Sequence, residues 1–149
     1  MTSTTIATVA ALATLVVNAV AAAFAGWRWW RVEPHDAVWP ILRAGQLFAG
    51  LWALVAGVLA LTGFEPSESL YWLYAVLPVA VGVIAEQLRI ASAEQVLEHR
   101  GLGDAQQVGA LSEPGQRSVV LAIVRREIGV MALAALVVAF LALRGVLIA

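Results

Sequence analysis

The sequence contains no cysteine and no lysine, and it has few charged residues of either sign. The lack of cysteine excludes disulfides, thiolate metal sites and iron–sulfur clusters. Only 13% of the 149 residues are charged and the net charge is −1, so the composition gives no basis for nucleic-acid binding. The chain is instead 62% hydrophobic with a mean hydropathy of +0.88, whereas soluble domains contain about 45–50% apolar residues. This composition excludes a water-soluble globular protein.

Four apolar stretches are long enough to cross a bilayer, which takes about 20 residues of helix. They are expected at about residues 6–27, 41–62, 69–88 and 119–143. The connections between them are short, so residues 1–149 are expected to form a single integral membrane domain. The predicted fold is all-α: a four-helix transmembrane bundle with a cytoplasmic helical extension between helices 3 and 4.

Arginines divide unequally between the two ends of the predicted bundle. The first and third connections with their flanks hold eight of the nine, whereas Arg144 lies at the other end with Glu65 and Glu68. Because cytoplasmic loops are rich in basic residues, loops 1 and 3 are expected in the cytoplasm and both termini outside the cell membrane. Interfacial aromatic belts are expected at Trp27, Trp29, Trp30 and Trp39 on the inner side and at Tyr71, Trp72 and Tyr74 on the outer side.

Helix-forming residues continue past the third span. Leu88, Ala91 and Leu97 recur at near-helical spacing, and Gly101 ends the pattern. A flexible loop of about fifteen residues is expected to follow, with the helix resuming near Gln116. Together these segments predict a helical hairpin that projects from the membrane.

Small residues recur at every fourth position on the first two spans. In lipid, such residues let helix backbones approach closely, so the sequence predicts a tight pair between the first and second helices. The positions are Ala10, Thr14, Asn18, Ala22 and Gly26 on the first span, and Gly45, Ala49, Ala53 and Gly57 on the second. The fourth span carries a further stripe at Ala132, Ala135, Ala139 and Ala142.

Bulky residues lie on the adjoining face of the second span, where Phe48, Trp52 and Leu59 fall together. This face must meet either the fourth helix or a neighbouring protomer. We expect an oligomer with Phe48 and Trp52 at or near its interface, formed with further copies of the chain or with a partner membrane protein.

Asn18 is the one strongly polar side chain near the middle of a predicted span. It is interpreted either as a contact with a pore or substrate, or as a hydrogen bond between helices.

Other polar residues are expected in a ring at the cytoplasmic edge. The ring is interpreted in two ways. It is either a binding site for an anion or a lipid headgroup, or it only anchors the protein, with its arginines on the cytoplasmic side as in other membrane proteins and in contact with membrane lipids. An ion pair is expected between Glu86 and Arg125 or Arg126, which fall at similar depth. The ring consists of Arg43, Gln46, Glu86, Arg89, Arg125, Arg126 and Glu127.

No motif predicts catalytic residues, a metal site or a cofactor. His35 and His99 fall in connections rather than inside the bundle, where axial haem ligands would be needed. The chain has no HExxH sequence and no glycine-rich phosphate loop.

Chain length, four spans and the expected outward N-terminus are similar to those of the MAPEG family of membrane glutathione-dependent enzymes. The resemblance implies an arginine-rich cytoplasmic site between subunits, in which an arginine of the second helix is paired with a downstream asparagine and glutamate. Residues 41–48 provide only Arg43 from that set, so the chain is not assigned to the family.

Three function classes follow. The first is a channel or small transporter, working as an oligomer. The second is a non-catalytic accessory or scaffold subunit of a membrane complex, which docks through the cytoplasmic hairpin. The third is a MAPEG-like membrane enzyme acting on lipophilic substrates.

Overall fold

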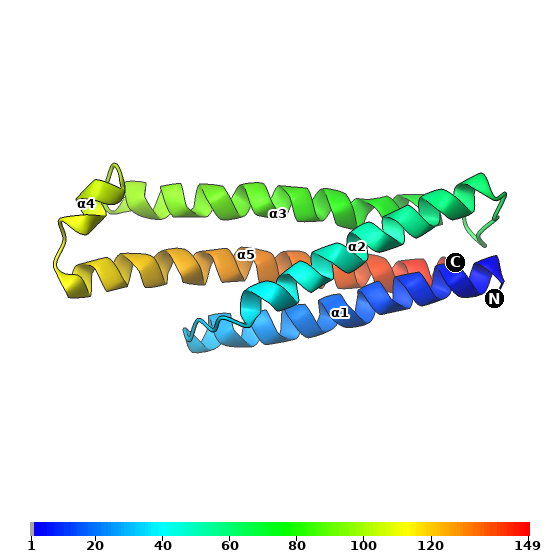
Figure 1. Ribbon diagram of the computed structural model, residues 1–149, viewed down its shortest axis with the longest axis horizontal. Helices are drawn as coiled ribbons and strands as arrows, with labels where there is room; N and C mark the ends of the chain where they lie inside the picture. Colours follow the sequence, from blue (N-terminus) through cyan, green and yellow to red (C-terminus); the bar gives the residue numbers. More distant parts are fainter. Residues whose placement is uncertain (1) are drawn as a thin grey trace.

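Four long helices dominate the computed structural model, which describes residues 2–149 (Figure 1). Helix accounts for 83% of the chain, and the described residues contain no strand. The four long helices are long and apolar enough to cross a membrane, which confirms the all-α bundle and a multi-pass membrane protein. The helices are α1 (Ser3–Arg31), α2 (Val38–Leu61), α3 (Tyr71–His99), the short α4 (Ala105–Gly109) and α5 (Glu113–Ile148).

Helix α5 is the centre of the bundle. It packs extensively on α1 and α3, whereas α2 packs mainly on α1 and only lightly on α3. Figure 1 shows α2 crossing the bundle obliquely, with both chain termini at one end and α4 at the other. Helices α3 and α5 extend together beyond α1 and α2 at the α4 end (Figure 1).

Buried positions on α1 and α2 recur at alternating intervals of three and four residues, as in left-handed helix packing. A spacing of four residues instead drifts around the helix by about 40° at each step. The predicted four-residue ladders therefore leave the contact face, so that Ala22 and Gly26 are only half-buried and Gly57 is exposed. The buried positions are Ala7, Ala11, Thr14, Asn18, Ala21 and Ala25 on α1, and Val38, Leu42, Gly45, Ala49, Trp52, Ala56 and Leu59 on α2.

The close pairing of α1 and α2 is confirmed near the middle of both helices. Thr14 Oγ1 donates to the Phe48 carbonyl at 3.1 Å, and Asn18 Nδ2 donates to the Gly45 carbonyl at 3.0 Å. A Cβ atom at Gly45 would lie 2.6 Å from Asn18 Oδ1, so only glycine allows this approach. Asn18 therefore forms the interhelical hydrogen bond that was one of its two interpretations.

Trp52 lies inside the protomer, so its predicted place at a protomer interface is wrong. Its side chain is fully buried, and its Nε1 donates to Tyr71 Oη at 3.3 Å. The indole ring occupies the space that Gly145 leaves on α5, which the pattern of α2 alone could not reveal. Tyr71 is also fully buried, and it belongs to this core rather than to an interfacial belt.

The connection after α3 contains more helix than predicted. Helix α3 runs unbroken to His99, as expected, but α4 follows from Ala105, capped by Asp104 Oδ1, which accepts from Gln107 N at 2.9 Å. Helix α5 then begins at Glu113, so the connection is shorter than the predicted fifteen residues and contains a short helix, whereas its flexibility stays a prediction. Pro114 fits the first turn of α5 because the N–H groups there need no partner within the helix.

Candidate functional site

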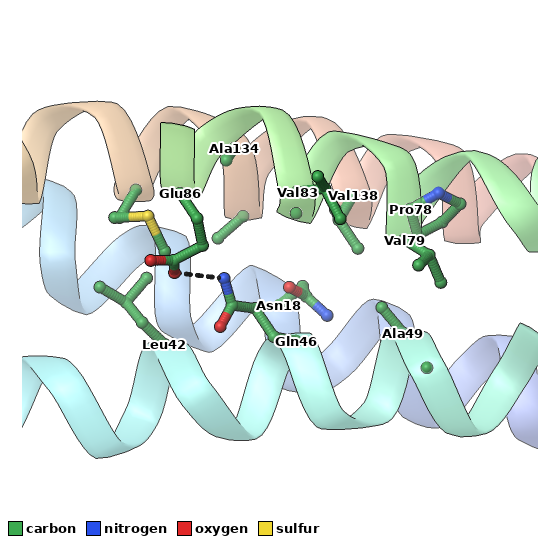
Figure 2. Close-up of a pocket in the computed structure, with 14 residues that line it drawn as sticks. Asn18, Leu42, Gln46, Ala49, Pro78, Val79, Val83, Glu86, Ala134 and Val138 are labelled. Atoms are coloured by element: carbon green, nitrogen blue, oxygen red, sulfur yellow. Dashed lines mark hydrogen bonds between the residues drawn. The ribbon is translucent and has the colours of Figure 1, made fainter. Parts of the chain in front are cut away.

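A cavity of about 260 Å³ opens between α2, α3 and α5, with Asn18 of α1 among its lining residues (Figure 2). Buried residues on α3 follow the same alternation of three and four, which passes from Pro78 through Gly82 to Ala85. Gly82 has no side chain to fill the space beside it, and a Cβ added at Gly82 would meet nothing within 4 Å. The cavity therefore lies where α2 and α3 are only lightly packed and where Gly82 has no side chain.

Apolar side chains form most of the cavity wall. On the α3 side, Val79 and Val83 line it and are also exposed, Val83 with 58% of its surface, so the cavity opens sideways between α2 and α3. In a membrane protein this opening faces the hydrocarbon region. The wall is completed by Leu42 and Ala49 from α2 and by Met131, Ala134, Ala135 and Val138 from α5.

Polar side chains gather at one end of the cavity. Figure 2 shows Asn18, Gln46 and Glu86 together, with Pro78 and Val79 toward the other end. Gln46 Nε2 donates to Glu86 Oε1 at 2.9 Å, which is the dashed line in Figure 2. The cavity is therefore amphipathic, with a long apolar part and one hydrogen-bonding end.

Glu86 is the centre of a charge cluster that we define as Arg43, Gln46, Glu86, Arg89 and Glu127. Besides the Gln46 bond, its carboxylate accepts from Arg43 Nη1 at 2.5 Å and from Arg89 Nε at 3.0 Å. Arg89 Nη1 also lies 3.7 Å from Glu127 Oε1. The cluster thus joins α2, α3 and α5, and its two arginines balance its two glutamates.

Arg125 and Arg126 lie outside this cluster, so the predicted pairing of either with Glu86 is wrong. Arg125 stacks over the Trp29 ring at 5.4 Å, and Arg126 donates to Gln95 Oε1 at 2.5 Å. Successive residues of a helix point about 100° apart, so residues 125, 126 and 127 cannot all face one neighbour. Arg126 contacts α3 at Gln95, nine residues beyond Glu86, and Glu127 is the one that lies beside Arg89 of the charge cluster.

Two contributors to the site were missed from the sequence. Arg89 lies over the Trp39 ring at 5.6 Å, so a residue assigned to the aromatic belt also holds the charge cluster in place. Gly82 creates the cavity, and its spacing of four residues from both Pro78 and Glu86 could have indicated that the three share one face. The predicted anion site itself stays a prediction.

The site can bind a molecule through apolar contact and a few hydrogen bonds. No group of three or more histidine, aspartate or glutamate residues able to hold a metal ion occurs among residues 2–149. The identity of a bound molecule must therefore be inferred from the cavity and the charge cluster. No protein-family model, curated protein or solved structure matches the chain.

Proposed function

We propose that this multi-pass membrane protein is a small transporter that holds one hydrophobic molecule in the cavity between α2, α3 and α5. The observation that carries the proposal is a cavity of about 260 Å³ with apolar walls and polar side chains at one end. A larger apolar groove lies between α1 and α5, but it is more open and has no charged residue in its lining. The molecule enters and leaves through the lateral opening between α2 and α3.

The size of the cavity suits a small ligand. An apolar cavity of about 150 Å³ can bind benzene, and pockets for drug-sized ligands range from about 300 to 1,000 Å³. The cavity of about 260 Å³ lies between these values. It holds a small hydrocarbon molecule, or one end of a longer lipid.

A carrier fits the protomer better than an open channel through its centre. Trp52 and Tyr71 are fully buried and fill the core beyond the cavity, toward the end of the bundle where the chain termini lie. A continuous passage along the bundle would have to cross this aromatic core. A pore between protomers and the accessory-subunit role remain separate hypotheses, and neither depends on whether a molecule occupies the cavity.

Filling the cavity tests the proposal. Gly82→Leu places a side chain into open space and removes a glycine from a helix interior, so we expect unchanged or slightly higher thermal stability. Wild-type protein purified in mild detergent should retain a hydrophobic small molecule detectable by mass spectrometry, and Gly82→Leu should retain at least about tenfold less. In proteoliposomes, counterflow of that molecule should be lost to the same extent.

The matched control is Gly57→Leu, since Gly57 is exposed on α2 and an added Cβ there also meets nothing within 4 Å. This variant should bind and transport like the wild type. Normal occupancy and counterflow in Gly82→Leu would contradict the transporter and would favour the accessory-subunit hypothesis.

Orientation in the membrane is a second expectation, and it follows from the arginine distribution. Because the chain has no cysteine, a single introduced cysteine gives an unambiguous label. On intact cells, an impermeant maleimide should label Glu65→Cys, whereas Ala105→Cys should react only after permeabilisation. Glu65 is preferable to Ser67, whose Oγ donates to the Ile148 carbonyl at 2.9 Å. The opposite labelling pattern would reverse the assigned orientation.

A further inference from the structure

The amide of Asn18 is held in a fixed orientation at the cavity. Its side chain is only 3% exposed, and Nδ2 donates to the carbonyls of Thr14 and Gly45, both at 3.0 Å. The reversed orientation would place Oδ1 against two carbonyl oxygens, so the hydrogen bonds themselves assign the two atoms. Among the described residues no donor contacts Oδ1, and this oxygen is not completely shielded inside the protein, so it is an open acceptor.

The other polar groups at the cavity are already engaged. Gln46 Oε1 accepts from Arg43 Nη1 at 2.6 Å, and Gln46 Nε2 uses one of its two hydrogens for Glu86. The Glu86 carboxylate accepts from Arg43, Arg89 and Gln46. At the polar end, Asn18 Oδ1 is therefore the acceptor that has no partner at all, and the second hydrogen on Gln46 Nε2 is an open donor.

The charges at this end of the cavity are balanced. Glu86 is paired with Arg43 and Arg89, and Arg89 is also close to Glu127. An ionic ligand would lose its hydration without gaining an unpaired counter-charge, which disfavours its binding. An uncharged polar group with a donor hydrogen satisfies the site better.

We infer that the ligand of this cavity is an uncharged alcohol or phenol with a hydrocarbon body. This inference rests on the proposed function and names the substrate class of the same site. Its hydroxyl group donates to Asn18 Oδ1 and has lone pairs to accept the free hydrogen of Gln46 Nε2. A ketone or ester offers acceptors only, and it would leave Asn18 Oδ1 unpaired. The hydrocarbon body lies along Val83, Met131 and Val138.

Two photoreactive probes that differ only in the hydroxyl group test this inference. One is an eight-carbon primary alcohol and the other the corresponding alkane, each carrying the same diazirine. The full-length protein is labelled in lipid nanodiscs, and the cross-linked residues are identified by peptide mass spectrometry. In the wild type, the alcohol should reach half-maximal labelling of cavity residues at about three- to tenfold lower membrane concentration than the alkane. Asn18→Ala should bring the two concentrations together, and Gly82→Leu should abolish cavity labelling by both.

The possible outcomes separate this inference from the proposed function. Equal labelling of wild-type cavity residues by both probes, lost in Gly82→Leu, would overturn the alcohol assignment and leave the cavity as a binding site. Cavity labelling that is absent, or that persists in Gly82→Leu, would overturn both. The wild-type comparison decides the question even if Asn18→Ala fails to fold. Gly57→Leu serves as the control, and it should label like the wild type.

Discussion

Gly145→Ala is expected to lower the free energy of unfolding by about 2–3 kcal/mol, because the added methyl group has no room. A Cβ atom at this position would overlap Cζ2 and Cη2 of Trp52. The indole ring is fully buried, and its Nε1 donates to the Tyr71 hydroxyl, so it cannot swing aside without losing that bond. Helices α2 and α5 would have to separate at the centre of the core. Equilibrium unfolding in detergent measures the loss.

Two further variants make this result specific to Trp52. Gly26→Ala is the control, because an added Cβ at Gly26 meets nothing within 4 Å, and it should leave stability unchanged or slightly raised. Trp52→Phe removes the part of the indole ring that Gly145 faces. Combined with Gly145→Ala, it should recover part of the lost stability. If Gly145→Ala were as stable as Gly26→Ala, the tight contact between α2 and α5 would be refuted.

Glu86→Ala should destabilise the protein by about 2–3 kcal/mol, since it removes charged hydrogen bonds and leaves two arginines without their partner. The Glu86 side chain is 24% exposed and the Arg89 side chain 27%, so neither is fully solvated. Loss of the carboxylate also removes the link between α2 and α3 at the polar end of the cavity. The measurement is thermal and denaturant-induced unfolding in detergent.

Glu94→Ala is the matched control for Glu86→Ala, because Glu94 is an exposed glutamate two turns along the same helix and has no ion-pair partner among the described residues. It should change stability by less than about 0.5 kcal/mol. Equal effects of the two substitutions would mean that the charge cluster contributes nothing to the fold. Glu86→Gln, which keeps the acceptor oxygen but not the charge, should fall between them.

The helical architecture could be predicted from the sequence because it depends on the length and hydropathy of each segment. Stretches of about 20 apolar residues must form helices in a bilayer, where every backbone group needs an internal partner. The same reasoning found the continuation of α3 to His99, which rests on local helix propensity. It missed α4 and the early start of α5, because Asp104 as an N-cap and Pro114 in a first turn resemble loop residues in composition.

The side-chain partners were harder to predict because they depend on the rotation of each helix about its axis. Depth alone suggested that Glu86 pairs with Arg125 or Arg126, yet Arg125 stacks on Trp29 and Arg126 bonds Gln95, farther along α3. The sequence left open whether the face with Trp52 meets the fourth helix or a neighbouring protomer, and it favoured the protomer because the pocket for Trp52 is formed by a glycine 93 positions later in the chain. The interhelical hydrogen bond of Asn18 could be anticipated because Asn18 and Gly45 both lie on faces of small residues. On such a face, the backbone of the neighbouring helix is the partner within reach of a polar side chain.

Asn18 contacts both the partner helix and the cavity, and this double position creates thermodynamic linkage. Its Nδ2 holds α1 against α2, while its Oδ1 is the group that a bound hydroxyl would engage. A hydrogen bond accepted by the oxygen of an amide polarises the group and strengthens the bonds that its nitrogen donates. If the cavity binds a hydroxyl group as proposed, occupancy would reinforce the α1–α2 pairing, and tighter pairing would raise affinity for the occupant by the same free energy. In the proposed transporter the loaded form would then be the stiffer one, and release of the molecule would begin with a loosening of the α1–α2 pair.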